Sequence, residues 1–315
     1  MMWYPAKAAF RAGSVDDTQW DIAKIGLASF AAGKNTTASG ENSTALGVLT
    51  WATGQASVAI GYSAAASAKY SLALGPGTIA SGDVSTAIGY NATASGEGSV
   101  AIGTNLVSTG SSTTTEATGT ASVAIGDALA SRGARSVVLG SYAKALQAGS
   151  GSFVFGDGSG SLANSLDVNT PNSFVARATG GVQFITGVGG CSLPAGGGQW
   201  ACASSRLLKT DFADVDGEGV LAKLREMPVQ SWSYSAEGPA RHIGPMSQDF
   251  HAAFGLGSDD KTIGVLDAAG VSIVGVKALE ARTTQLQQEN AQLRSALAGL
   301  EARLAAVEGP HRSRR

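Results

Sequence analysis

Large apolar and small side chains alternate in a short phrase that recurs nine times in the first half of the chain. The phrase has the form Ser-x-Ala-Ile-Gly, with variants, and its copies open at Ser29, Ser43, Ser57, Ser71, Ser85, Ser99, Ser122, Ser136 and Ser152. The first six copies keep a strict period of 14 residues. A unit this short cannot bury its own apolar face, so it must stack on its neighbours. The fixed period therefore predicts a solenoid.

The alternation within the phrase predicts a strand whose two faces differ. Val58 and Ile60 fall on one face, and Ser57, Ala59 and Gly61 fall on the other. We expect the larger side chains to fill the coil, and the thin Ser/Ala/Gly face to let a second chain approach closely. The Ala/Thr/Ser/Gly runs between phrases suit a second strand and tight corners. Each unit is therefore interpreted as one coil of a parallel β-roll that oligomerises.

Residues 29–156 resemble the head repeats of trimeric autotransporter adhesins, in which three left-handed β-rolls pack around a common axis. The resemblance implies a mainly β fold, a left-handed parallel β-roll solenoid, and a homotrimer. A nine-residue insertion within residues 104–119 breaks the period, and we interpret it as a loop that bulges from the rod.

Other patterns divide the chain into further segments. Residues 1–25 are expected to cap a roll over residues 26–160, with the aromatic residues Trp3, Tyr4, Phe10 and Trp20 covering its first coil. Residues 161–203 are expected to form a connector with a hairpin between residues 173–178 and 181–186, turning at Thr179 and Gly180. A small α+β domain over residues 204–275, a coiled coil over 276–308 and a solvated basic tail over 309–315 follow.

Spacings of three and four between apolar residues predict the coiled coil. The a and d positions are Val276, Leu279, Thr283, Leu286, Asn290, Leu293, Leu297, Leu300, Leu304 and Val307. Asn290 falls at an a position, where a buried amide fixes register. An a-position asparagine favours dimers in isolated zippers, so the expectation of three chains rests on the roll and on the resemblance described next.

Residues 203–209, residues 241–248 and a closing helix from about Val271 resemble the endosialidase-type intramolecular chaperone, or peptidase domain, of phage tail fibres and tailspikes. In that family a Ser-Asp-x-x-Leu-Lys motif holds a Ser/Lys dyad that cuts the chain just before the serine. The chaperone trimerises the fibre and then leaves it. The resemblance implies that Ser204 is the nucleophile, that Lys209 is its general base, and that the bond from Ala203 to Ser204 is cut. Any enzymatic activity is expected to be at most this single-turnover self-cleavage.

Two departures from the family pattern bear on cleavage. Ser205 stands where the family has Asp, and Ser247 replaces Ala in the Gly-x-x-Ala-Gln element at residues 244–248. A lysine acts as a base only when neutral, so a dry site or a positive charge such as Arg206 must lower its pKa. Residues five apart point in different directions on a regular helix, so Ser204 should lie in an extended or turn segment. Cleavage and a permanent trimerisation clamp are both open.

Composition agrees with a fibre, because 43 residues are Gly and only 15% are charged. A net charge of −2 argues against nucleic-acid binding. His242, His251 and His311 lack ligand spacing, so neither a metal nor a cofactor is expected. Cys191 and Cys202 are either a disulfide or two free thiols. No signal peptide and no membrane-spanning apolar run is visible, and the resemblances imply a bacterial surface or a virion tail.

Two function classes remain. The first is a trimeric fibre or adhesin-like protein that binds a host-surface receptor or glycan. The second is a tailspike-like enzyme that binds or degrades glycans with a carboxylate pair on the rod. The acidic residues that bear on it are Glu41, Asp83, Glu97 and Asp127. Asp83 and Glu97 share one repeat phase, which is more typical of a solvated ladder than of an acid/base pair.

Overall fold

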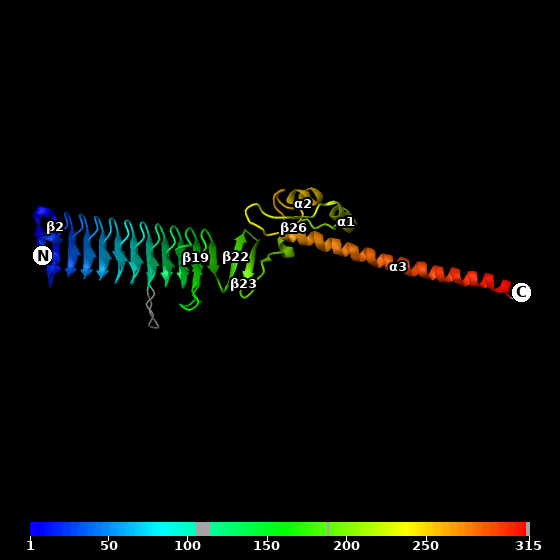
Figure 1. The fold of residues 1–315 in the computed structure, drawn as a ribbon, viewed down its shortest axis with the longest axis horizontal. Coiled ribbons are helices and arrows are strands. Elements are labelled where there is room, and N and C mark those ends of the chain that lie inside the picture. The colour runs from blue at the N-terminus through cyan, green and yellow to red at the C-terminus, as the bar shows by residue number, and fades with distance from the viewer. Residues whose placement is uncertain (105–113, 188, 313–315) are drawn as a thin grey trace. The chain divides into compact units, whose positions relative to one another are not determined.

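The computed structural model describes residues 1–104, 114–187 and 189–312. The chain forms two compact units, Met1–Leu208 and Lys209–Arg315. The first unit is a stack of short strands, and the second is helical with one small hairpin (Figure 1). The boundary falls four residues after Ser204.

The first long sheet of the first unit has the order β1-β2-β3-β5-β7-β9-β11-β13-β15-β17-β19-β21. Its strands are β1 (Met2–Tyr4), β2 (Ala9–Ser14), β3 (Phe30–Lys34), β5 (Thr44–Val48), β7 (Val58–Tyr62), β9 (Leu72–Leu74), β11 (Thr86–Gly89), β13 (Val100–Thr104), β15 (Val123–Asp127), β17 (Val137–Ser141), β19 (Phe153–Gly156) and β21 (Phe174–Arg177). Strands β2 to β21 are parallel and keep the repeat in register, so that Ala59 lies opposite Ala73. Strand β1 is antiparallel to β2 and covers this edge of the sheet.

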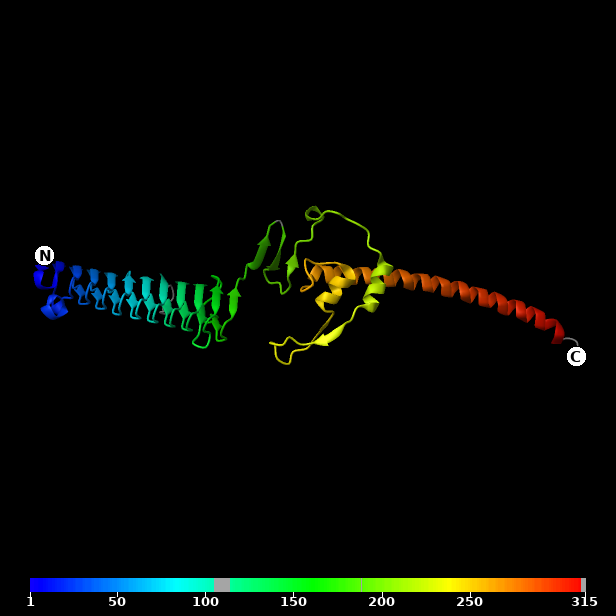
Figure 2. The ribbon, with the colours of Figure 1, turned by 90° about the horizontal axis from the view of Figure 1, so that it is seen from above.

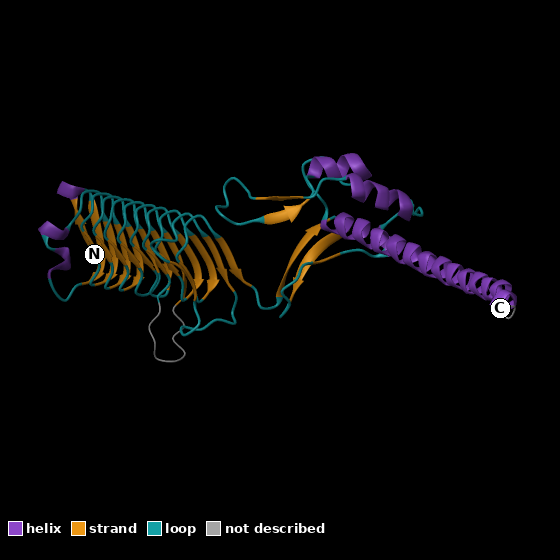
Figure 3. Ribbon diagram, turned by 45° about the vertical axis from the view of Figure 1, so that its right-hand side comes forward, coloured by secondary structure: helices purple, strands orange, loops and turns teal. Residues whose placement is uncertain are grey.

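The second long sheet supplies the other strand of each coil. Its strands are β4 (Thr37–Ala38), β6 (Trp51–Ala52), β8 (Ala65–Ala66), β10 (Ile79–Ala80), β12 (Thr93–Ala94), β14 (Glu116–Ala117), β16 (Ala130–Ser131), β18 (Ala143–Ala145) and β20 (Leu166–Val168). The strands of the two sheets alternate along the chain, with loops at the corners (Figure 3). The predicted parallel β-roll is confirmed.

Register is kept on both sides of the predicted insertion. Val100 of β13 lies opposite Val123 of β15, and Thr93 of β12 lies opposite Glu116 of β14. The centre of the insertion, residues 105–113, lies outside the described residues. The extra residues therefore enter between β13 and β14 without shifting the coils that follow.

The interior of the roll is lined by small side chains, so the expected orientation of the phrase is wrong. Ala59 and Ser57 are fully buried, whereas Val58 and Ile60 are partly exposed. The same holds along the stack, where the buried cluster includes Ala31, Ala45, Ala73, Ala87, Ala101 and Ala124. In most coils of 14 residues with two corners the interior has room for small side chains, although Leu129, Val138 and Val154 are buried inside the later coils. The larger apolar side chains at the second and fourth positions of the phrase therefore point out of the roll.

The stacking of successive coils is equally tight at the glycine that ends the phrase. Gly47 has φ of +118°, and a Cβ added there would lie 2.0 Å from the carbonyl oxygen of Gly61 in the next coil. No side chain fits in that distance, and the positive φ also favours glycine. The final glycine of the phrase is thus required by close approach of two backbones.

A buried arginine closes the first coil. Arg11 lies in register with Ala31 and takes the interior position that alanine holds in the next coil. Its Nη1 donates to the carbonyl oxygens of Phe10 and Ser29, at 2.8 and 2.9 Å, and its Nη2 donates to Ser29 Oγ and Ala38 O. Of the expected aromatic cap, Phe10 instead stacks on Phe30 outside the coil, with ring centroids 5.4 Å apart.

The roll gains a final coil where we expected half of a hairpin. Strand β21 pairs in parallel with β19, and Phe174 stacks on Phe153 at 5.3 Å between ring centroids. The hairpin is formed instead by β22 (Gly181–Thr186) and β23 (Gly189–Pro194), with β24 (Ala201–Cys202) as a third antiparallel strand. The predicted hairpin is wrong because residues 173–175 repeat the Ser-Phe-Val that opens the preceding copy at residues 152–154 and extend the stack.

An ion pair holds this last coil. Arg177 Nε lies 3.1 Å from Asp157 Oδ1, and the guanidinium also donates to the carbonyl oxygen of Asn164. The Asp157 carboxylate accepts hydrogen bonds from the hydroxyls of Ser159 and Thr179 and from the Thr179 N–H. These hydrogen bonds hold the pKa of Asp157 well below its usual range. The bond from the Ser159 hydroxyl lowers it most, and the two bonds from Thr179 come next.

Acid should therefore weaken this end of the roll. A carboxyl whose pKa is lowered by folding stabilises the native state above its unfolded pKa of about 4, and this stabilisation is lost as the pH falls below that value. We expect the melting temperature of the wild type to exceed that of Asp157→Asn at pH 6, and the difference to shrink steadily from pH 4 to pH 2. Thermal melts of both proteins over this range test it. A difference that stays constant down to pH 2 would contradict it.

The second unit packs two short helices against the start of a long one (Figure 2). Its elements are α1 (Gly217–Glu226), β25 (Gln230–Trp232), β26 (His242–Gly244), α2 (Ser247–Phe254) and α3 (Val265–Arg312). The core is formed by Val220, Phe250 and Val271. Asp216 caps α1 by accepting from the N–H of Glu218 at 3.1 Å.

The described residues of the first unit also contain four short 3-10 helices, which are η1 (Pro5–Lys7), η2 (Thr18–Trp20), η3 (Ile22–Lys24) and η4 (Arg206–Leu208).

The predicted apolar seam of α3 is exposed along its length. Its leucines and both valines are each more than half exposed, from Val276 to Val307. Asn290 donates from Nδ2 to the carbonyl oxygen of Leu286, at 2.9 Å. Of the helices in the described residues, none is long and apolar enough to cross a membrane.

Candidate functional site

The segment that carries Ser204 leaves the three-stranded sheet and enters a single helical turn. The N–H of Ala203 still donates to Gly190 O of β23, at 2.9 Å, and η4 begins at Arg206. Ser204 thus lies in an exposed, non-helical stretch between β24 and η4, as the spacing of the dyad requires. The bond before Ser204 joins a residue held by the sheet to one outside it.

Ser205 caps the turn η4. Its Oγ accepts from the N–H of Leu207 at 3.3 Å, and its carbonyl oxygen accepts from the N–H of Leu208 at 3.1 Å. Serine and aspartate are both preferred where a side-chain oxygen must satisfy the first N–H groups of a helix. The residue that replaces the family's Asp therefore keeps the capping oxygen and lacks the negative charge.

Lys209 is the first residue of the second unit, and Ser204 belongs to the first. The side chains of Ser204, Arg206 and Lys209 are all exposed in the single chain. The Ser204–Lys209 dyad therefore stays a prediction, and its basis is the motif and the non-helical backbone at Ser204.

The other motif of the predicted chaperone domain spans β26 and the start of α2. Gly244 ends β26, and Ser247 is the first residue of α2. In the same hairpin, His242 Nε2 lies 2.8 Å from Glu237 Oε2, and its ring stacks on Trp232 with centroids 4.7 Å apart. Because of these contacts with Glu237 and Trp232, His242 is a packed surface side chain. The Glu237 partner was not expected, since nothing in the sequence pattern marks that residue.

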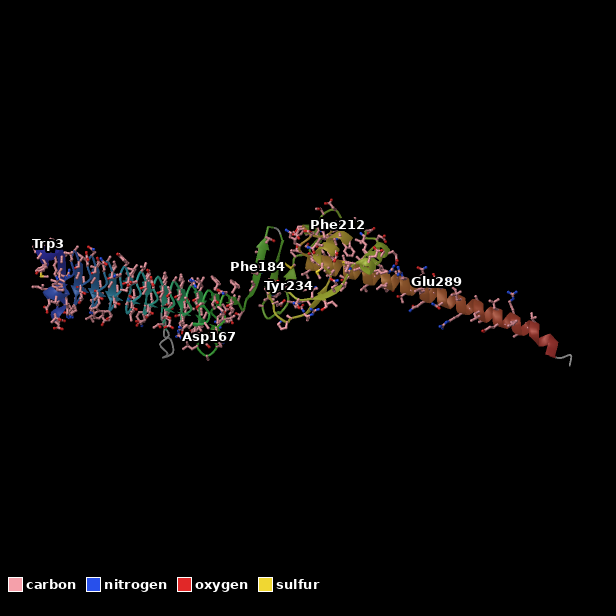
Figure 4. The ribbon with its side chains drawn as sticks, turned by 45° about the horizontal axis from the view of Figure 1, so that its top comes forward. Trp3, Asp167, Phe184, Phe212, Tyr234 and Glu289 are labelled. Carbon is pink, nitrogen blue, oxygen red and sulfur yellow. A yellow bond between two sulfur atoms is a disulfide. The ribbon has the colours of Figure 1, made fainter. Side chains whose placement is uncertain are left out.

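The two cysteines form a disulfide. Cys191 of β23 lies directly opposite Cys202 of β24, with Cα atoms 3.9 Å apart. Of the alternatives left open by the sequence, the structure has the bonded one. In β22, Phe184 (Figure 4) lies opposite Cys191. Its ring contacts that of Trp200, with ring centroids 5.7 Å apart. The disulfide stands two residues before Ser204.

The outward face of the first sheet carries an apolar stripe, which we call the outer stripe. It consists of the second and fourth positions of the phrase and includes Val58, Ile60, Leu72, Leu74, Ile88, Val100, Ile102, Val123, Ile125, Val137 and Leu139. Phe30 and Phe155 are each 38% exposed near its two ends. Contiguous exposed apolar surface of this kind marks an interaction site.

The alternation by itself predicts that this stripe lies in the interior, although the sequence carries a signal for the true orientation. The third position of the phrase is alanine in seven of nine copies, whereas the second varies among Phe, Thr, Val and Leu. A position held mostly by alanine is typical of a tight interior. A position that accepts four sizes is typical of a surface that packs less tightly.

The acidic residues of the rod lie on or near its surface. Glu41, Asp83 and Glu97 are exposed, Asp127 is partly buried, and Asp83 Oδ1 accepts from the N–H of Lys69 at 3.1 Å. The glycan-processing alternative stays a prediction. Within the described residues, no group of three or more His, Cys, Asp or Glu side chains is placed to hold a metal ion.

Two family models match the chain, in the expected order. The YadA head domain repeat matches residues 25–49, 52–78 and 80–105, and the chaperone of endosialidase matches residues 204–255. These matches support a trimeric adhesin-like or tail-fibre-like protein. The first lies on the roll and the second begins at Ser204, so both resemblances are confirmed. Comparison with curated proteins finds no match for the chain. Adhesin-type repeats are typical of proteins exposed on a cell surface or a virion.

Proposed function

We propose that the protein is a homotrimeric fibre, an adhesin or tail fibre, whose C-terminal chaperone drives trimerisation and then cuts itself off before Ser204. The observation that carries this proposal is the outer stripe. The roll has buried its small residues inside, and the Val, Ile and Leu side chains of the outer stripe remain partly exposed in a single chain. Covering the exposed part of these side chains by another chain is favourable, at about 25 cal/mol per Å² of apolar surface removed from water.

The second unit supports the same assembly. The seam of α3 is apolar and exposed over residues 276–307, and the charged side chains of α3, such as Glu289 (Figure 4), lie outside it. A seam at heptad spacing is covered by packing against the same seam of other copies. The outer stripe and the α3 seam are thus each incomplete in one copy, and further copies of the chain can cover each of them.

The proposed cut uses the serine that follows the scissile bond. Ser204 Oγ attacks the carbonyl carbon of Ala203 while Lys209 accepts the hydroxyl proton, and the C–N bond breaks as the amino group of Ser204 takes up a proton. Water then hydrolyses the ester between Ala203 and Ser204 Oγ. The products are a carboxylate at Ala203 and a free amine at Ser204.

Assembly and cutting are linked in this proposal. A neutral lysine requires surroundings that disfavour its charged form. Ser204 and Lys209 are exposed in the single chain, so we infer that neighbouring protomers cover them in the trimer. Cleavage would then begin only after the three chains have met, and the chaperone would not leave before its task is done. The released rod would be exposed on a cell surface or virion, where it meets a host receptor or glycan.

The assembly is tested by mass in solution. We expect light scattering of the full chain to give three copies, because the outer stripe and the α3 seam are both incomplete in one copy. A gene that lacks residues 204–315 is expected to give insoluble or unassembled rods. A stable folded monomer of the full chain would contradict the trimer. Soluble trimers of the shortened chain would show that the second unit is a tip and not a chaperone.

A further inference from the structure

The cut that we propose would leave a new chain end in an unfavourable place. The last residues of the first fragment would be Ala201, Cys202 and Ala203, and strand β24 contains only the first two. Both are exposed, and β24 lies at the edge of its sheet, in the order β22-β23-β24. Chain ends are ordered only when something ties them down, and a two-residue edge strand has few hydrogen bonds with which to do so.

The disulfide lies where it can tie this end to the sheet. Cys202 is the last residue of β24, one residue before the proposed new terminus, and Cys191 lies in the middle of β23. Strand β23 is paired along its whole length with β22, from Gly189 to Pro194. The bond therefore fastens the shortest strand of the sheet to its best-held strand.

We propose that the Cys191–Cys202 disulfide is a clasp that holds the end of the rod in place after the chaperone has left. The inference rests on the proposed cut before Ser204. A second contact also holds this chain end, namely the hydrogen bond from the Ala203 N–H to Gly190 O. Ala203 directly follows Cys202 in the sequence. With the clasp closed, the last residues stay on the sheet. With the clasp open, they detach, and the Gly-rich loop over residues 195–199 detaches with them.

The first test uses the uncut chain. Hydrogen exchange is measured in Ser204→Ala, before and after dithiothreitol reduces the disulfide to two thiols and becomes a cyclic disulfide itself. We expect the amides of residues 201–203 to exchange at least about tenfold faster after reduction, while those of β22 keep their rates. The matched control is Ser204→Ala with Cys191→Ser and Cys202→Ser, which should exchange fast with or without reductant. Equal protection of residues 201–203 in the oxidised and reduced chains would overturn the clasp.

The second test uses the cut protein. Carboxypeptidase is added to the fragment of residues 1–203, and its mass is followed. We expect Ala203, whose release requires no break in the disulfide, to be removed at least about tenfold faster from the reduced fragment than from the oxidised one. Equal rates would overturn the clasp. A wild type that intact mass shows to be uncut would instead overturn the proposed cleavage, and with it the need for a clasp at a new terminus, whatever the exchange data show.

Discussion

The full chain is expected to split into fragments of residues 1–203 and 204–315, and either Ser204→Ala or Lys209→Ala is expected to keep it whole. This is an all-or-none effect, because the cut needs both the attacking oxygen and the base. Intact mass of the purified protein measures it directly. The basis is the matched motif at residues 204–209 and the exposed, non-helical backbone at Ser204.

The residue beside the nucleophile has two possible roles, to cap η4 and to supply a negative charge. Substitutions of Ser205 separate these two roles. Its side chain caps η4, so Ser205→Asp and Ser205→Asn both keep an oxygen at the cap, and the first alone adds a charge. We expect Ser205→Asp to speed cleavage and Ser205→Asn to leave it unchanged. An uncut wild type that stays uncut as Ser205→Asp would show that the domain is a permanent trimerisation clamp.

Two neighbouring residues of β11 are expected to respond to aspartate in opposite ways. Ala87 is fully buried inside the roll, and Ile88 lies on the outer stripe. Ala87→Asp would place an unpaired carboxylate in the interior at a cost of about 3–5 kcal/mol. For a unit of this size we expect the melting temperature of the roll to fall by roughly 10 °C, or the roll to fail to fold.

Ile88→Asp should spare the coil and break the assembly. Its carboxylate would stay in water in one chain, whereas three copies would bring three like charges into one desolvated interface. We expect light scattering to report monomers and circular dichroism to keep the strand signal. The control is Ile88→Leu, which preserves the apolar surface and should remain trimeric. Loss of the strand signal in Ile88→Asp with a folded Ala87→Asp would reverse our assignment of the two faces.

The disulfide shows which features of this chain can be predicted from local sequence and which depend on the tertiary structure. The spacing of Cys191 and Cys202 left a bonded and a free state equally open. Pairing became decidable only when β23 and β24 lay side by side, because a disulfide needs Cα atoms within a few ångström of each other. The hairpin at Thr179 was misplaced for a related reason. A turn signal does not say whether the strand before it pairs with the next strand or with one that came 20 residues earlier.

Periodicities and short patterns predict the solenoid, the coil length, the seam of the long helix and the motif at Ser204, since such patterns need no partner to be recognised. Which face of the phrase is inside follows only from the folded coil. Period-two alternation distinguishes the two faces of the strand but does not say which face is inside. The usual preference for large apolar side chains in a core predicted the wrong face. The width of the coil reversed that preference: two strands joined by tight corners leave space mostly for Ala, Ser and Thr, with Val138 and Val154 in two of the later coils. The Val, Ile and Leu side chains at the second and fourth positions therefore point outward, where another chain can cover them.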